Sequence, residues 1–178
     1  MAFLDLLTQL HHYTSYPEES VVVNQFLDLL KHPRAYHRDH LPGHITGSAW
    51  IVNESRTKTL LIQHAKLKRW LQPGGHADGE RDIPNVARRE AEEETGLRKI
   101  KLLREDIFDL DIHLIPDRKD FPQHWHYDVR FLFEGDEKDE LFISDESTGL
   151  DWFELPSLKE LTENNNSIMR MVHKTNIL

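Results

Sequence analysis

Apolar side chains recur at near-helical intervals in the first forty residues. One such run covers residues 3–10, and a second covers residues 22–30. The segment between them, Thr14-Ser15-Tyr16-Pro17, is typical of a turn, and Pro33 ends the second run. The pattern predicts two helices, which form an N-terminal extension over residues 1–40 before a domain at residues 41–178.

From residue 44 the apolar pattern changes to that of strands. Residues 44–52 are rich in β-branched and aromatic side chains, and residues 59–63 follow after a polar turn, which predicts a hairpin. A helix is expected from Pro84 to Thr95, because Asp82 stands at the N-cap position and Gly96 provides a stop. Further strands are predicted at 69–72, 101–104, 108–115, 126–134 and 150–153, and further helices at 157–161 and 167–174. The strands and the central helix indicate one mixed α/β domain.

Composition narrows the range of functions. The chain has no cysteine, which excludes disulfides, thiolate metal sites and cysteine catalysis. Its formal charge of −9 disfavours extended nucleic acid as a partner, although a local cation or metal still allows a small anionic ligand. Neither a membrane-spanning apolar run nor a secretory signal is evident, so we expect a cytoplasmic protein without a membrane partner.

The predicted central helix carries a group of glutamates. At 3.6 residues per turn, Glu90, Glu93 and Glu94 fall within an arc of roughly 100°. A run of charge on a helix is usually a solvated face. However, Gly74 and Gly75 lie just upstream and let the backbone approach a ligand closely. Three hard oxygen ligands on one face suit Mg²⁺ or Mn²⁺.

The sequence here resembles a known family. Gly75, followed at the family's spacing by Arg-Glu-Ala-Glu-Glu-Glu-Thr-Gly-Leu at residues 89–97, is similar to the Nudix box. One position departs, because Arg81 stands where the family has glutamate, with Glu80 one residue earlier. The resemblance extends over roughly residues 44–155 and implies an α/β/α sandwich with a mixed sheet. It also implies a Mg²⁺-dependent (alternatively Mn²⁺-dependent) pyrophosphatase that acts on a nucleotide.

The resemblance also implies roles for individual residues. Glu90, Glu93 and Glu94 correspond to the metal ligands, the carbonyl of Gly74 is a further candidate, and Arg89 orients the glutamates. The general base is left open between Glu90, Glu93 and a carboxylate from a later loop, for which Glu146 is the candidate. The substrate expected for the family is a nucleoside diphosphate derivative of the ADP-ribose, nucleotide-sugar or nucleoside triphosphate type.

A basic segment precedes the glycine pair in this acidic chain. Lys66 and Lys68 are candidates to attract phosphates, and Trp70 is a candidate to stack on a base. An equally weighted alternative is a solvated hairpin edge with one aromatic residue in the core.

A second polar cluster lies in two predicted strands. Strand alternation places His124, His126, Asp128 and Arg130 on one face, and Asp109, Asp111 and His113 alternate likewise in the preceding strand. If the strands pair, these side chains share one surface. That surface is solvent-exposed, lines the substrate cleft through His126, Asp128 and Arg130, or binds a transition metal through imidazole. His44 and His173 are interpreted as surface residues.

Three other functions are less consistent with the sequence. Isopentenyl-diphosphate isomerases share this type of fold but rely on a cysteine, which this chain lacks. A catalytically silent nucleotide-binding sensor is disfavoured by the intact box glutamates and by the absence of a basic recognition helix. A purely structural module leaves the glycine–glutamate spacing unexplained. The N-terminal helices are left as either a lid or a dimerisation surface, so a homodimer is an open option.

Overall fold

A computed structural model describes residues 4–13, 19–119, 121–145 and 147–177. Some predicted features lie outside the described residues: the first residue of the 3–10 run, the turn at 14–17 and the candidate base Glu146. Every other predicted helix and strand is present with shifted ends, and one additional strand, β4, forms at the glycine pair. The elements are α1 Leu6–His12, α2 Ser20–Leu29, β1 Gly43–Val52, β2 Lys58–His64, β3 Arg69–Leu71, β4 Gly74–His76, α3 Ile83–Thr95, β5 Lys101–Leu102, β6 Asp109–Ile115, β7 His124–Glu134, β8 Ser147–Glu154, α4 Leu158–Leu161 and α5 Asn166–Asn176.

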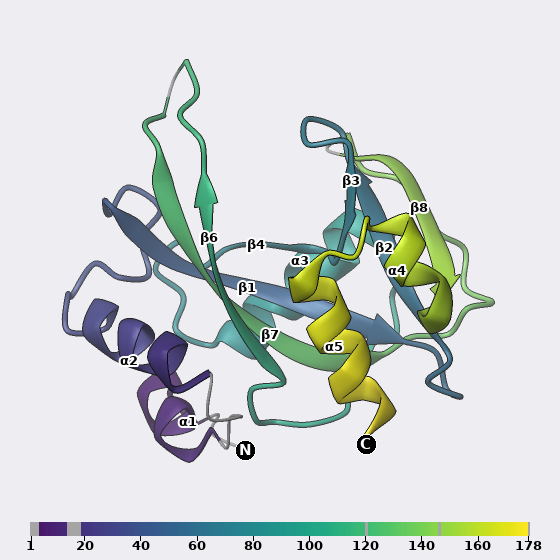
Figure 1. Cartoon of the computed structure of the whole chain (residues 1–178), viewed down its shortest axis with the longest axis horizontal. Helices are drawn as coiled ribbons and strands as arrows, with labels where there is room; N and C mark the ends of the chain where they lie inside the picture. Colours follow the sequence, from purple (N-terminus) through teal and green to yellow (C-terminus); the bar gives the residue numbers. More distant parts are fainter. Residues whose placement is uncertain (1–3, 14–18, 120, 146, 178) are drawn as a thin grey trace.

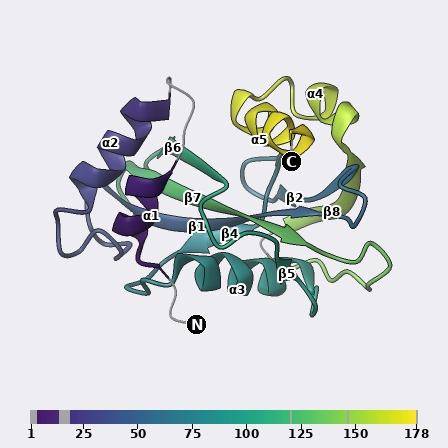
Figure 2. The ribbon, with the colours of Figure 1, turned by 90° about the horizontal axis from the view of Figure 1, so that it is seen from below.

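The strands form one mixed sheet. Its main path runs β3-β2-β1-β7-β5, with β4 paired to β1, β6 to β7 and β8 to β2. The long central strands β1 and β7 are parallel, whereas the other pairs are antiparallel. Helix α3 lies on one face of the sheet, and α4 and α5 lie on the opposite face (Figures 1 and 2). The predicted α/β/α sandwich is therefore confirmed.

Strand β1 is buried on both of its faces. Ile45, Ala49 and Ile51 belong to the core cluster that includes the apolar side of α3. Trp50 and Val52 point the other way, into a second cluster with α5. Because helices cover both faces of the sheet, all ten residues of β1 are buried, including the polar ones.

The N-terminal helices pack against the core on the α3 side of the sheet. Leu6, Leu10 and Phe26 belong to the same buried cluster as Ile45, and the Phe26 ring meets Tyr127 of β7 edge-on at 5.2 Å between centroids. A boundary at residue 40, and a role as lid or dimer surface, stay predictions. Across the described residues, no helix is long and apolar enough to cross a membrane.

Candidate active site

Helix α3 is fixed at both ends by the residues that the sequence indicates. The Asp82 side chain accepts a hydrogen bond from the backbone N–H of Asn85, and a proline occupies the first turn. Gly96 adopts the left-handed conformation, with φ of 75°, and donates its backbone N–H to Glu92. The apolar side of the helix, including Val86 and Ala91, is buried against the sheet. The glutamates on the other side therefore project from a rigid element.

The carboxylates of Glu90 and Glu94 lie against the backbone of the glycine pair. Gly74 donates its N–H to Oε2 of Glu94 at 2.8 Å. A Cβ atom added to Gly75 would lie 2.3 Å from Oε2 of Glu90, which is closer than any side chain allows. Glycine is therefore required at position 75 for the Glu90 carboxylate to lie where it does.

Arg89 contacts two of the three predicted ligands. Its Nη1 atom donates to Oε1 of Glu90 at 2.6 Å and lies 3.7 Å from Oε2 of Glu93. Its Nη2 atom donates to the carbonyl of His76 at 3.4 Å, which links the helix to strand β4. This geometry supports the role of Arg89 in orienting the glutamates.

The departure at Arg81 leaves the start of α3 intact. The Arg81 guanidinium lies over the Tyr36 ring, 5.5 Å from its centroid. Glu80, one residue earlier, accepts a hydrogen bond from the Asn85 side chain at 2.7 Å. A glutamate thus still contacts the first turn of the helix, although it is one position earlier than in the family pattern.

The polar faces of β6 and β7 do form one surface, but that surface is covered. The two strands pair with Asp109 opposite Arg130 and His113 opposite His126. Asp109, Asp128 and Arg130 are each at most 3% exposed. The solvent-exposed interpretation is therefore wrong for these residues, because α5 packs over them and Ser167 accepts a hydrogen bond from Arg130.

Three cations surround the buried carboxylate of Asp109. Its carboxylate accepts hydrogen bonds from Arg130 at 3.0 Å, Arg170 at 2.8 Å and Lys174 at 2.7 Å. Burial opposes its ionisation, but these cations outweigh burial and hold the pKa of Asp109 below its ordinary value. Burial likewise opposes ionisation of Asp111, and the charge of Arg130 leads the contacts that lower its pKa. Asp109 and Asp111 are therefore both ionised in the folded chain.

Asp128 also bonds within the protein. It accepts from the hydroxyls of Thr46 and Ser48, at 2.9 and 2.7 Å, and from Nε of Arg130 at 2.8 Å. These contacts join β1 to β7 and leave the substrate role of Asp128 and Arg130 a prediction.

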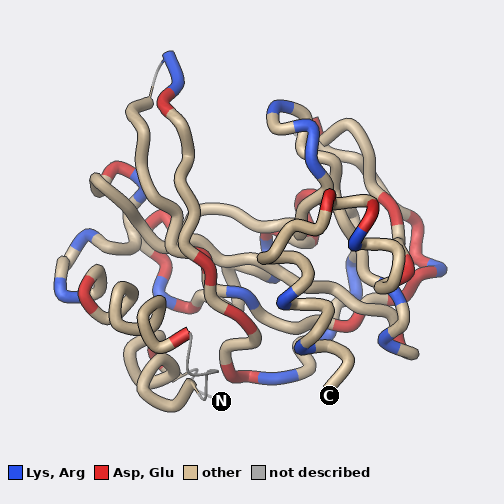
Figure 3. Tube along the Cα trace, viewed as in Figure 1, with Lys and Arg blue, Asp and Glu red and all other residues tan. Residues whose placement is uncertain are grey.

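The basic segment lies in and beside the turn between β2 and β3. Lys66 and Lys68 are exposed there, at a tip that carries blue segments in Figure 3. Trp70 is half-buried and packs edge-on against Phe153, with 4.7 Å between ring centroids. This packing favours the core interpretation of Trp70, and substrate contacts by the three residues stay predictions.

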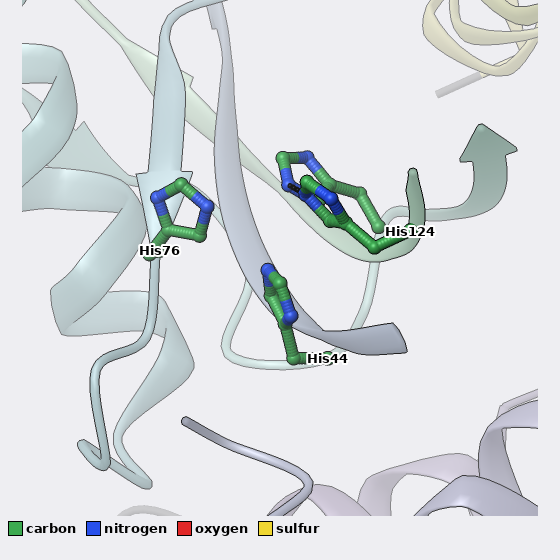
Figure 4. Close-up of side chains that lie close together, drawn as sticks. His44, His76 and His124 are labelled. Carbon is green, nitrogen blue, oxygen red and sulfur yellow. Dashed lines mark hydrogen bonds between the residues drawn. The ribbon is translucent and has the colours of Figure 1, made fainter. Parts of the chain in front are cut away.

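Sequence reasoning did not place His44 and His76 beside His124 and His126. The surface interpretation of His44 is wrong, because the residue is 0% exposed, whereas His173 is exposed as expected. His44, His76, His124 and His126 come together at one end of the sheet (Figure 4). The signal that links His44 to His126 is their pairing in the parallel β1–β7 register, which strand alternation within each segment does not reveal.

Comparison with known proteins identifies the family. A model of the NUDIX domain matches residues 43–173, and this chain therefore belongs to the NUDIX family. It is accordingly a Nudix hydrolase, as the resemblance of its glutamate helix implies. A search of curated proteins by sequence gives no match.

Solved structures share the fold. A Nudix family hydrolase from Clostridium perfringens is 26% identical, with a TM-score of 0.57 over 75% of this chain and 97% of that one. An Ap4A hydrolase from C. elegans is 20% identical, with a TM-score of 0.59 over 75% and 95% of the two chains. A MutT protein from Methanosarcina mazei Go1 is 18% identical, with a TM-score of 0.56 over 76% and 94%.

Proposed function

We propose that this chain hydrolyses a phosphate anhydride bond in a nucleoside diphosphate derivative, with Mg²⁺ held by Glu90, Glu93 and Glu94. The carbonyl of Gly74 is a further ligand in this proposal. The observation that carries it is the convergence of the Glu90 and Glu94 carboxylates on the backbone of the glycine pair. These hard oxygen donors fit Mg²⁺ or Mn²⁺ and do not suit a soft metal.

When bound, the metal neutralises diphosphate charge and lowers the pKa of a coordinated water. The chain's own contribution is to hold the donors in place. Glu94 is fixed by the N–H of Gly74, and Glu90 is fixed by Arg89. Since α3 is capped at both ends, these positions are set before substrate binds, which reduces the entropic cost of reaching the reactive geometry.

A carboxylate must accept the proton that the attacking water loses. Glu93 is the most exposed of the three box glutamates, with 61% of its side chain accessible, and is our preferred base. Glu90 and Glu146 remain the alternatives. Lys66, Lys68 and Trp70 remain candidates for substrate contacts.

The substrate class rests on family membership. We favour ADP-ribose or a nucleotide-sugar over a nucleoside triphosphate. The solved Ap4A hydrolase shares only the fold with this chain at 20% identity, so Ap4A belongs in the test panel and not in the proposal.

The test is phosphate release from ADP-ribose, nucleotide-sugars, nucleoside triphosphates and Ap4A with and without Mg²⁺. For ADP-ribose, nucleotide-sugars and Ap4A, which have no terminal phosphate, a phosphatase added after the reaction converts the phosphorylated products into measurable phosphate. For nucleoside triphosphates, inorganic pyrophosphatase is added instead, because it acts only on the released pyrophosphate. Wild type is compared with Glu93→Gln and with Glu92→Gln, which changes an exposed glutamate outside the proposed ligand set.

We expect Mg²⁺-dependent turnover that falls by about 10²–10⁴-fold in Glu93→Gln, the range typical for loss of a general base. The Glu92→Gln variant should retain wild-type turnover. Nucleotide binding without turnover in wild type would instead support the silent sensor, and equal turnover in both variants would refute the role of Glu93.

A further inference from the structure

Four histidines from three strands meet on the face of the sheet opposite the glutamates. His44 lies on β1 opposite His126 of β7, and His124 lies two residues before His126 on the same face. On β4, a Cβ atom at Gly75 would meet Glu90, whereas one at Gly74 would meet Ser48 of β1. His76, two residues after Gly74, therefore points to the face of Ser48 and His44, away from Glu90.

The four imidazoles are close enough to bind one ion. Each offers a ring nitrogen, and these nitrogens all lie within 4.8 Å of one another. Nε2 of His124 and Nε2 of His126 are 3.2 Å apart. A tetrahedral site with Zn–N bonds of about 2.0–2.1 Å requires nitrogens about 3.4 Å apart, so small side-chain rotations complete the geometry. Figure 4 shows the labelled rings of His44, His76 and His124 around a common centre.

Backbone carbonyls set the orientation of two of the rings. Nδ1 of His124 lies 2.8 Å from the carbonyl of Pro122, and Nδ1 of His44 lies 3.2 Å from the carbonyl of His40. A carbonyl only accepts, so each Nδ1 carries the hydrogen and each Nε2 presents a lone pair. This arrangement is the usual outer-shell support of a metal-binding histidine.

One of these lone pairs is buried without a partner. Nε2 of His44 is buried, and none of the described residues provides it with a hydrogen bond. Burial of a polar atom without a partner is costly, so it calls for an explanation such as an ion or a water. A hydrogen bond between His124 and His126 explains those two rings but leaves His44 and His76 unexplained.

Burial favours the neutral form of three of the four rings. It lowers the pKa of His44, that of His76 to about 4 and that of His126 to about 2, with the neighbouring histidines adding to the effect for His126. Neutral imidazole is the form that binds metal.

We propose that His44, His76, His124 and His126 form a second metal site, which binds Zn²⁺ and is separate from the Mg²⁺ site of the glutamates. Four imidazole nitrogen donors and no carboxylate favour zinc over magnesium, because imidazole suits transition metals and oxygen suits Mg²⁺. Four protein ligands complete a tetrahedral shell, so the ion is structural and holds no water for catalysis.

The position of this site gives it a consequence for the active site. Zinc would join β1, β4 and β7, and β4 carries the Gly74–Gly75 pair that contacts Glu94 and Glu90. The carbonyl of His76 also accepts a hydrogen bond from Arg89. Zinc would therefore fix the strand that precedes α3, and its removal would loosen the glycine pair.

The first experiment uses the full-length wild-type chain. The protein is stripped with a chelator, dialysed and titrated with Zn²⁺ and separately with Co²⁺. We expect about one zinc per chain and a higher unfolding temperature, because an ion that binds only the folded state stabilises it. Bound Co²⁺ should give the visible absorption of a tetrahedral ion. In NMR spectra, the imidazole signals of the cluster should shift on zinc addition.

The matched variants are His44→Gln, His126→Gln and the control His113→Gln. His113 is adjacent, with its ring 5.4 Å from that of His126, but does not belong to the four. We expect zinc affinity to fall by more than about 100-fold in the first two variants, since even outer-shell partners contribute about 10–100-fold. The control should bind like wild type.

The wild-type measurements decide the proposal even if a variant fails to fold. Zinc that does not bind at near-unit stoichiometry, an octahedral Co²⁺ spectrum, or imidazole shifts confined to other histidines would overturn it. Equal zinc affinity in His113→Gln and His44→Gln would overturn it as well.

Discussion

Two groups of carboxylates in this protein have different surroundings. On α3, Glu90 and Glu93 share contacts with Arg89, and Glu94 accepts a backbone N–H from Gly74. On the opposite face of the sheet lie Asp109 and Asp111, which we call the aspartate group. Asp109 forms ion pairs with three cations and is 0% exposed. The side chains of the aspartate group are 0% and 18% exposed, whereas that of Glu93 is 61% exposed.

This difference separates a structural charge network from the carboxylates that we propose to bind Mg²⁺. Ion pairs that are fully buried and hydrogen-bonded hold elements together, and here they join β6, β7 and α5 with the segment before α2 through Glu19. The glutamates have fewer cations around them: Glu90 and Glu93 share only Arg89, and Glu93 is 61% exposed. The sequence singles out the glutamates by their spacing after the glycine pair, but it does not predict that Asp109 is buried among cations.

The largest stability effect is expected when the buried network is broken. Asp109→Asn leaves Arg130, Arg170 and Lys174 without their shared anion, so we expect the free energy of unfolding to fall by about 3–5 kcal/mol. Urea denaturation followed by circular dichroism measures this change. Glu93→Gln is the control from the other group, and it should change the free energy of unfolding by less than about 0.5 kcal/mol because its side chain is mostly exposed. Similar losses in both variants would remove the distinction between the groups.

The parts of the fold that follow from local rules could be predicted from sequence. Helix α3 was placed within one residue, because its cap at Asp82 and its stop at Gly96 act locally. Strand β4 was missed, since a glycine pair has no strand propensity and pairs only because β1 lies beside it. The glutamates were found by their spacing on one helix. The histidine cluster was not, because it depends on the parallel pairing of β1 with β7 across about eighty residues.

The glutamate group can be perturbed through the backbone that it contacts. In Gly75→Ala the new methyl group would displace the Glu90 carboxylate, which is the flexible end of a side chain, so the fold should change little. We expect the Mg²⁺ concentration needed for half-maximal turnover to rise by about 10–100-fold, the range seen when support of a ligand is lost. Activity titrated with Mg²⁺ measures this shift. An unchanged Mg²⁺ requirement would show that Glu90 does not hold the ion.

Acid should lower the stability that the buried carboxylates Asp109 and Asp111 provide. Burial opposes ionisation of Asp109 and Asp111, yet the neighbouring cations keep the pKa of each below the ordinary 3.8. The unfolded chain therefore takes up protons before the folded chain does. The stability that these groups provide is fully present above the unfolded pKa and is lost as the pH falls through 3.8 toward the folded values. The loss is at most about 1.4 kcal/mol per pH unit for each carboxyl.

The test is a series of denaturation midpoints measured from pH 6 to pH 3 for wild type and Asp111→Asn. The midpoints should fall less steeply with decreasing pH in the variant, and parallel curves would contradict this assignment.

Exposed ion pairs are expected to contribute least to the free energy of unfolding. Asp28 of α2 and Lys31, just after the helix, are 2.5 Å apart, a shorter distance than the hydrogen bonds to Asp109 given above, yet their side chains are 75% and 77% exposed. Water screens such a pair and its long side chains lose freedom when it forms, so Lys31→Ala should cost no more than about 0.5 kcal/mol. Denaturation of Lys31→Ala, Asp28→Ala and the double variant gives the coupling energy directly. A coupling as large as the Asp109→Asn effect would mean that distance, and not burial, governs charge stabilisation here. A negligible coupling would assign the stabilising role to the buried network that α5 covers.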